Sequence, residues 1–125
     1  MAKVLLIEDN LDSAEMLGML LEFQGHLVAR AASGQAGIAL ANTFFPNVII
    51  VDLLLPDVDG IDIIASLRSA ATHKTSLILA LSNINDMETR ERARLAGVDH
   101  YFAKDEDVAL LLSLIDMRAD ESNQT

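Results

Sequence analysis

The sequence contains no cysteine and no long hydrophobic run. The absence of cysteine excludes disulfide bonds, thiolate zinc sites and cysteine nucleophiles. A membrane-spanning helix needs roughly 20 consecutive apolar residues, and every apolar run here is much shorter. Met1-Ala2-Lys3 lead directly into a strand-like segment, without the apolar core of a signal peptide. We therefore expect a cytoplasmic protein that does not associate with membranes.

Basic residues are also scarce. The 125 residues include 9 Lys and Arg against 19 Asp and Glu, which gives a formal net charge of −10. A chain with this charge is repelled by nucleic acids and by anionic lipid, so we expect no direct nucleic-acid binding. The length is typical of one domain, and 51% hydrophobic residues argue against disorder.

Short apolar runs alternate with segments of helical spacing along the whole chain. This alternation predicts an α/β three-layer sandwich, in which a five-stranded parallel sheet is flanked by five helices and the crossovers are right-handed. Ser33 is the expected N-cap of one helix and Gly97 the expected stop of another. The strands are expected at 3–7, 27–31, 48–51, 77–81 and 100–103, and the helices at 12–23, 33–41, 61–71, 86–96 and 108–118.

We expect one domain over residues 1–119, followed by a polar segment at 120–125 that is a frayed tail or the start of a linker. The chain suits a stand-alone protein or the first domain of a longer protein. Helix 108–118 is rich in Leu, Ile and Val, and a wide stripe of core residues is favoured over a partner surface. Met16, Met19 and Met87 are expected to pack in the core. The three histidines have no metal-ligand spacing and are expected to be structural or at the surface; they are His26, His73 and His100.

Charged and hydroxyl side chains follow four of the expected strands. They are Glu8 and Asp9, Asp52, Ser82, and Lys104. The carboxyl ends of parallel strands open at one edge of the sheet, where open α/β sheets bind their ligands. Three carboxylates at one edge repel one another unless a hard cation joins them. Oxygen ligands suit Mg²⁺ or Mn²⁺.

Each of these residues also has a simpler interpretation. Asp9 or Asn10 suits the N-cap of the following helix, and an Asp after a strand often starts a turn. A lone Ser82 is commonly an ordinary residue at a strand end, and a lone Lys104 is commonly solvated. Only the combination of these residues favours a functional site.

The segment from Asp52 to Gly60 carries a specific spacing of Asp, Pro and Gly. Together with the residues at the strand ends, it resembles the receiver domain of two-component response regulators, of the chemotaxis-regulator type. The resemblance covers residues 3 to about 117. It implies a flavodoxin-like fold with strand order 2-1-3-4-5. The family's acidic pair, phosphoacceptor, hydroxyl residue, lysine and strand-five aromatic match Glu8 and Asp9, Asp52, Ser82, Lys104 and Tyr101.

The resemblance implies that Asp52 accepts a phosphoryl group from a sensor histidine kinase or a histidine phosphotransfer protein. Asp9, Asp52 and the Leu54 carbonyl would hold Mg²⁺, with Glu8 acting directly or through a bound water. Ser82 and Lys104 would neutralise the phosphoryl oxygens. The chain would thus catalyse its own phosphorylation without being an enzyme in the usual sense.

A switch is implied as well. Ser82 would move toward the phosphoryl group, and Tyr101 would turn inward. The face formed by 86–96, 100–103 and 108–118 would then change toward a downstream effector or a second copy of the chain. The arginines of 86–96 are expected to form a solvated face with local ion pairs.

The sequence departs from the family pattern at two positions. Asp105 follows Lys104 where the family usually has a proline in a cis bond. A cis bond without proline costs about 3–4 kcal/mol, so we expect a trans bond. Asn83 stands where a small residue is usual, and its bulk would narrow access to the phosphorylation pocket. Leu54 and Ile84 flank the expected path of the attacking water, and neither can orient a water, so we expect slow self-dephosphorylation.

Two other functions compete with the phosphoacceptor hypothesis. A pseudo-receiver would keep the fold as an interaction module without phosphorylation, and Asp105 and Asn83 favour it weakly. A haloacid-dehalogenase-type phosphatase would need a second aspartate two residues after the nucleophile. Leu54 occupies that position, which argues against a phosphatase.

Overall fold

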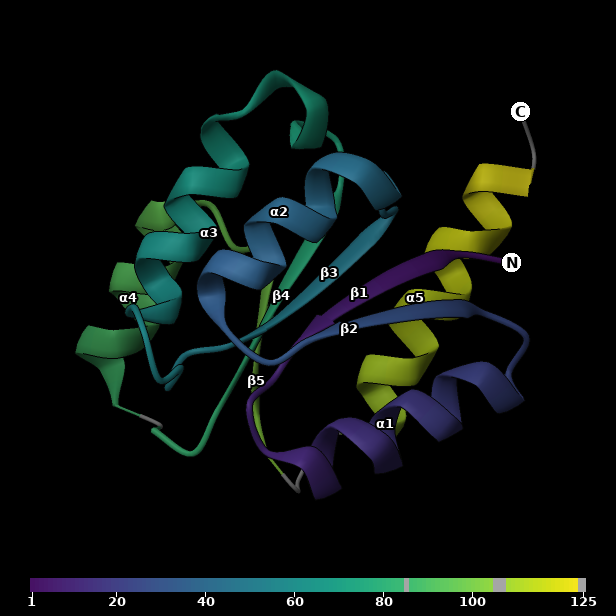
Figure 1. Cartoon of the computed structure of the whole chain (residues 1–125), viewed down its shortest axis with the longest axis horizontal. Helices are drawn as coiled ribbons and strands as arrows, with labels where there is room; N and C mark the ends of the chain where they lie inside the picture. Colours follow the sequence, from purple (N-terminus) through teal and green to yellow (C-terminus); the bar gives the residue numbers. More distant parts are fainter. Residues whose placement is uncertain (85, 105–107, 124–125) are drawn as a thin grey trace.

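A five-stranded parallel sheet lies between two layers of helices (Figure 1). The computed structural model describes residues 1–84, 86–104 and 108–123, with side chains as far as Asp120. The strand order is β2-β1-β3-β4-β5, and every pair is parallel, as predicted. The strands are β1 (Lys3–Ile7), β2 (Leu27–Ala31), β3 (Val48–Asp52), β4 (Leu77–Ser82) and β5 (His100–Ala103). The helices are α1 (Leu11–Phe23), α2 (Gly34–Phe44), α3 (Gly60–Ser69), the 3-10 turn η1 (Ala71–His73), α4 (Met87–Ala96) and α5 (Val108–Asn123).

The two faces of the sheet make two separate cores because successive strand residues point to opposite sides. Val4 and Leu6 of β1 pack with α1 and α5, whereas Leu5 and Ile7 pack with α2 and α3. Figure 1 shows this division of the helices between the two sides. The continuous apolar runs of the central strands follow from burial on both faces.

Helix ends agree with the expected caps in most places. The Ser33 side chain accepts from the Ala36 N–H at the start of α2. Gly97 closes α4 in the left-handed conformation, with φ 113°. Asn10, and not Asp9, caps α1 by accepting from the Ser13 N–H.

The predicted end of the last helix was wrong. Helix α5 continues to Asn123 instead of ending at Arg118. Ala119 is buried, which anchors the turn beyond Arg118, and no Gly or Pro follows to stop the helix. The predicted core stripe of α5 is confirmed by Leu111 and Ile115, although Leu110 and Met117 are exposed.

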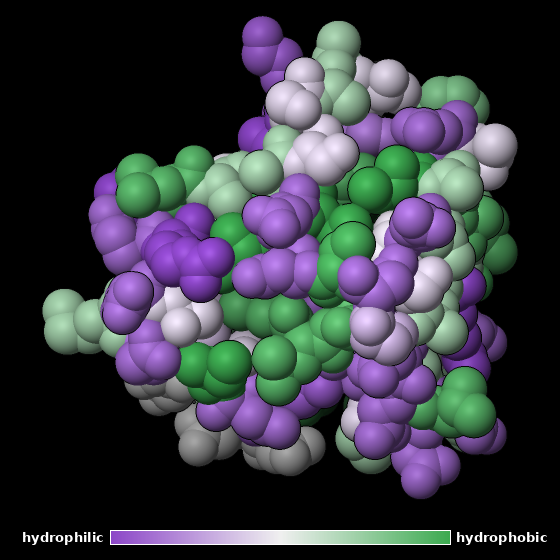
Figure 2. All heavy atoms as spheres, turned by 60° about the vertical axis from the view of Figure 1, so that its left-hand side comes forward, coloured by the Kyte–Doolittle hydropathy of each residue, from purple (hydrophilic) through white to green (hydrophobic). Residues whose placement is uncertain are grey.

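The methionines were also predicted wrongly. Met16 and Met19 on α1 and Met87 on α4 are more than half exposed. Met16 and Met19 lie opposite the buried stripe of Ala14, Leu17 and Leu21, so the helical spacing places them on the solvent side of α1. Figure 2 views the side of the molecule that carries α3 and α4, where apolar patches lie among charged side chains. Leu54, Met87 and Leu95 are exposed hydrophobic residues of these segments and of the loop before α3.

The histidines are structural or at the surface, as expected. His26 is buried, with Nδ1 accepting from the Ala2 N–H and Nε2 2.8 Å from an Asp116 oxygen. His73 is buried, with Nε2 3.3 Å from the Asn42 side-chain oxygen, and His100 is exposed. Within the described ranges, none of the helices has the length and apolar character of a membrane span.

Gly60 allows the loop after β3 to fold back against the strand. Its N–H donates to the Leu53 carbonyl, and a Cβ at this position would overlap the Asp52 carbonyl oxygen and the Leu53 Cα. Both of these neighbours are backbone atoms, which cannot move aside as a flexible side chain would. Gly60 therefore fixes how closely α3 approaches the end of β3.

We predict that Gly60→Ala lowers the free energy of unfolding by about 1–3 kcal/mol, the usual cost of overpacking. Urea denaturation followed by circular dichroism measures the change. The control is Ser66→Ala, at an exposed position of the same helix, which should alter stability by less than about 0.5 kcal/mol. Equal stability of the two variants would contradict the close approach.

Candidate functional site

The sheet brings the expected site residues together at the carboxyl ends of its strands. Asp52 is the last residue of β3, and Ser82 is the last residue of β4. Glu8 directly follows β1, and Lys104 directly follows β5. Since β1, β3, β4 and β5 are successive neighbours in the sheet, these four ends form one edge.

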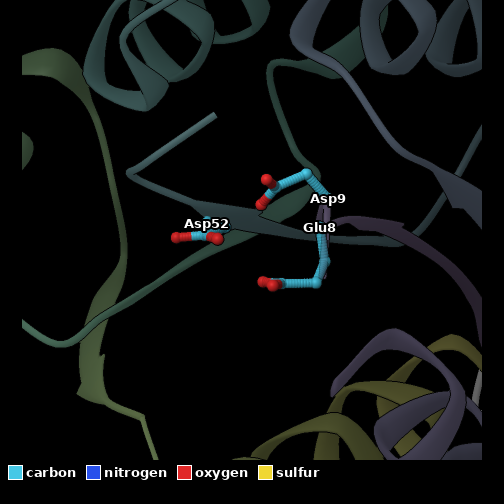
Figure 3. A group of neighbouring side chains, drawn as sticks. All are labelled: Glu8, Asp9 and Asp52. Carbon is cyan, nitrogen blue, oxygen red and sulfur yellow. The ribbon is translucent and has the colours of Figure 1, made fainter. Parts of the chain in front are cut away.

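Three carboxylates meet at this edge. Each of Glu8, Asp9 and Asp52 has a carboxylate oxygen within 4.8 Å of those of the other two. Figure 3 shows the side chains of Glu8 and Asp9 reaching from the end of β1 toward Asp52 on β3. Glu8 and Asp52 are buried, at 4% and 2% exposure, whereas Asp9 is exposed. Buried carboxylates this close are costly unless positive charge compensates them.

Lys104 supplies part of that positive charge. Its Nζ lies 3.1 Å from Glu8 Oε1 and 3.0 Å from Asp52 Oδ2. Burial alone would lower the pKa of Lys104, but hydrogen bonds and attraction from the Asp52 and Glu8 carboxylates raise it above its usual value. The lysine therefore stays charged and links two strands that are not adjacent to its own.

Glu8 does not gain enough from this contact to ionise easily. Burial, followed by a hydrogen bond and repulsion from Asp52, raises the pKa of Glu8 from 4.5 to about 7, and Lys104 only partly offsets the rise. Glu8 Oε1 also accepts from the Asn10 N–H. Glu8 Oε2 is buried without a hydrogen-bond partner among the described residues. An oxygen in that position needs a cation, a proton or a water.

The three carboxylates fit a hard divalent cation. All the donors are oxygens, which Mg²⁺ and Mn²⁺ prefer. One of them, Glu8 Oε2, has no hydrogen-bond partner among the described residues and can bind a cation. Three carboxylates and one ammonium sum to two negative charges when all are ionised, which a divalent ion balances. Asp52 Oδ1 accepts from the Leu54 N–H at 3.0 Å, which ties the following loop to the same carboxylate.

The two residues expected to form a switch are linked through the backbone of one residue, Ile84. Ser82 is fully buried, and its Oγ accepts from the Ile84 N–H at 2.9 Å. The Tyr101 hydroxyl donates to the Ile84 carbonyl. Tyr101 is half-buried and packs against the core on the α2–α3 side of the sheet. The Arg90 guanidinium lies 4.6 Å from the centre of the Tyr101 ring.

Sequence reasoning missed the contacts of three residues at this site, although it placed Ile84 beside the path of the attacking water. Ile84 acts through its backbone, which no side-chain pattern reveals. Arg90 was expected to belong to a solvated face, and its contact with Tyr101 arises only when α4 packs beside β5. Asp57 accepts from the Gly34 and Gln35 N–H groups at 2.8 and 3.0 Å.

Asp57 anchors the β3–α3 loop to the start of α2. The two backbone hydrogen bonds lower the pKa of its carboxyl group, and the positive end of the helix dipole favours the charged form. The loop that begins at Leu54 is thereby held at both ends, by Asp52 and by Asp57. A contact across more than 20 positions leaves no local signal in the sequence.

The two departures from the expected pattern have different outcomes. Asn83 is exposed beside the site. Asp105 lies outside the described residues, so the expected trans bond after Lys104 stays a prediction.

Leu54 is 58% exposed and Ile84 is half-buried. Both line one groove with Arg92, and the Arg92 guanidinium lies 3.6 Å from an Asp59 carboxylate oxygen.

A protein family and several curated proteins match this sequence. The family described as "Response regulator receiver domain" matches residues 4–116. The transcriptional regulatory protein CusR of Escherichia coli is 37% identical over 113 residues, which cover 90% of this chain and 49% of CusR. The cell cycle transcriptional regulator CtrA of Caulobacter vibrioides is 32% identical over 117 residues, or 90% of this chain and 50% of CtrA.

Solved structures agree. The chemotaxis response regulator CheY4 of Vibrio cholerae superposes with a TM-score of 0.86 at 26% identity, over 94% of this chain and 98% of CheY4. A CheY-like receiver domain protein of Methanospirillum hungatei gives a TM-score of 0.84 at 25% identity, over 98% and 96% of the two chains. The present chain spans about half the length of the curated relatives above.

We predict that Glu8 makes the stability of the metal-free protein depend on pH. The folded chain holds the Glu8 proton up to pH about 7, whereas an ordinary glutamate loses it near 4.5. Folding therefore takes up a proton between these values, and the contribution of Glu8 to stability falls as pH rises through this window. Urea denaturation of wild type and Glu8→Gln in a chelator, from pH 5 to 8, isolates this contribution.

The difference in unfolding free energy between the two proteins should shift in favour of Glu8→Gln as pH rises. Groups away from Glu8, including His73, titrate alike in both proteins and cancel. Parallel pH profiles would contradict the raised pKa of Glu8.

Proposed function

This chain belongs to the response regulator receiver domain family, and on that premise we propose that Asp52 is its phosphoacceptor. The donor is the phosphohistidine of a sensor histidine kinase or of a histidine phosphotransfer protein. The observation that carries the proposal is the contact of Lys104 with the buried Asp52 and Glu8 carboxylates beside Asp9. A structural lysine at a strand end would not need two buried carboxylates.

In the proposed step an Asp52 oxygen attacks the phosphorus and forms an acyl phosphate. The phosphorus–nitrogen bond of the phosphohistidine breaks, and its electron pair leaves with the imidazole. Lys104, held 3.0 Å from Asp52 Oδ2, orients the nucleophile and then donates to a phosphoryl oxygen. The Ser82 hydroxyl donates to a second phosphoryl oxygen, and the rest of the catalysis is positioning.

Asp9, Asp52 and the Leu54 carbonyl would hold the Mg²⁺ or Mn²⁺ ion, with Glu8 as a direct ligand or a partner of bound water. When bound, the ion supplies positive charge for the oxygens of the transferring phosphoryl group. Glu8 Oε2 and the exposed Asp9 carboxylate do not contact Lys104 and are therefore available to bind the ion.

Phosphorylation would add about −1.5 to −2 charge at neutral pH. Ser82 would move toward this charge, Tyr101 would pack more firmly inward, and the face of α4, β5 and α5 would change. That face would contact a downstream effector or a second copy of the chain in the cytoplasm. The strongly acidic chain would be repelled by nucleic acid and would not bind it directly.

We predict that acetyl phosphate with Mg²⁺ adds one phosphoryl group to the chain, seen by intact-mass spectrometry. Asp52→Asn and a chelator should each abolish the gain, because the first removes the nucleophile and the second the charge compensation. Asp62→Asn, at an exposed position of α3, is the matched control and should be phosphorylated normally. An unmodified wild-type chain with intact circular dichroism would contradict the proposal and favour a pseudo-receiver.

We also predict that the acyl phosphate decays slowly. Leu54 and Ile84 line the groove beside the site and offer no polar side-chain atom to hold the attacking water. The double variant Leu54→Asn, Ile84→Glu should shorten the half-life of the phosphorylated chain, measured by mass after removal of the donor. The half-life of Leu55→Asn, which lines the same groove, should stay close to that of wild type. Equal half-lives of wild type and the double variant would refute the role of these two positions.

A further inference from the structure

Arg90 covers the ring of the residue expected to act as a switch. Its guanidinium lies 4.6 Å from the centre of the Tyr101 ring, within the range of a cation–π contact. Arg90 is in the first turn of α4 and Tyr101 is in β5, so the contact joins two elements of the face expected to change. Both residues line one groove on that face, with Met87 and Arg94 beside them.

The tyrosine beneath Arg90 is connected to the phosphorylation site through a single residue. Its hydroxyl donates to the Ile84 carbonyl, and the Ile84 N–H donates to Ser82 Oγ. Ile84 is thus held on both sides by hydrogen bonds. If the Tyr101 ring moves, its hydrogen bond to the Ile84 carbonyl stretches or breaks. If Ser82 moves, its hydrogen bond from the Ile84 N–H stretches or breaks.

The other basic residues of α4 do not have this contact. Arg94 forms an ion pair with Glu91, at 2.5 Å, within the same helix. Arg92 points to Asp59, at 3.6 Å, at the start of α3. Arg90 and Arg94 are one helical turn apart and line the same groove, so Arg94 provides a matched control for the loss of one positive charge.

We propose that Arg90 is a positioning residue that clamps Tyr101 against Ile84 and thereby holds Ser82 ready for the phosphoryl group. The proposal rests on the proposed function of Asp52. Because coupling is reciprocal, a carboxylate-bearing partner that draws Arg90 away from the ring would weaken phosphorylation, and phosphorylation would strengthen the clamp. Binding of a partner in the α4–β5 groove would then change phosphorylation at the site, and phosphorylation would change binding in the groove.

The ring position can be measured without any label. Tyr101 is the only tyrosine and the chain has no tryptophan, so intrinsic fluorescence reports on this ring alone. Acrylamide is an uncharged quencher, and its access to the ring is insensitive to the charge that a variant removes. A cation–π contact at an exposed site is worth about 0.5–1 kcal/mol, a factor of about two to five in the ring's equilibrium.

The first experiment compares acrylamide quenching of the unphosphorylated wild type, Arg90→Gln, Arg90→Lys and Arg94→Gln. Arg90→Gln should shift the ring's equilibrium about two- to fivefold toward the accessible position, and Arg90→Lys should restore part of the protection because it keeps the charge. Arg94→Gln should quench like wild type. Equal quenching of Arg90→Gln and wild type, or equal increases in Arg90→Gln and Arg94→Gln, would overturn the proposal.

The second experiment tests the connection to the site. Ser82→Ala removes the acceptor of the Ile84 N–H and should also increase quenching. With acetyl phosphate and Mg²⁺, the rate of mass gain should fall in Arg90→Gln in proportion to the clamped fraction that the quenching shows to be lost, by at most about fivefold, and stay unchanged in Arg94→Gln. Increased quenching with an unchanged rate would overturn the coupling.

Failure of the proposed function would look different from failure of the clamp. If no variant and no wild-type chain gained mass, the phosphoacceptor proposal would fail. The quenching arms need no phosphodonor, so they would still decide whether Arg90 and Ser82 position Tyr101.

Discussion

Two buried carboxylates beside one another are the constraint on which the rest of this structure depends. Glu8 and Asp52 are almost fully buried, and this burial, together with the hydrogen bond and repulsion between them, raises the pKa of Glu8. Lys104 offsets only part of this cost through contacts of 3.1 and 3.0 Å. The site is therefore short of positive charge, and it gains stability from whatever cation or proton it binds. In the proposed function this imbalance recruits the divalent ion that prepares Asp52 for phosphoryl transfer.

The fold maintains this imbalance by tying the site to rigid elements. Parallel strands bring residues distant in sequence to one edge. All residues of β3 are buried, which holds Asp52 in place at the end of the strand. Gly60 lets α3 begin against the end of that strand, and Asp57 fastens the intervening loop to α2. On the opposite side of the site, Ser82 and Tyr101 both bond to the backbone of Ile84, which would give the proposed phosphorylation of Asp52 a path to the surface of α4 and β5.

The alternation of strands and helices and the gathering of the strand-end residues were predictable from hydrophobic patterning, which is local and redundant, whereas the strand order was implied by the family resemblance. The cap of α1 was predicted only as Asp9 or Asn10, since both residue types cap helices and only the backbone geometry distinguishes them. The extension of α5 depends on burial of Ala119, which is a tertiary contact. The roles of Arg90 and Asp57 come from packing between elements far apart in the sequence.

Calorimetric titration of the metal-free chain with Mg²⁺ tests the central claim most directly. The account predicts one ion per chain, and at least about a tenfold loss of affinity in Asp9→Asn, equivalent to about 1.4 kcal/mol. Asp12→Asn, which alters an exposed carboxylate in the first turn of α1, should bind like wild type. The absence of saturable binding, or equal affinities of Asp9→Asn and wild type, would contradict the claim that these carboxylates are arranged for a divalent cation.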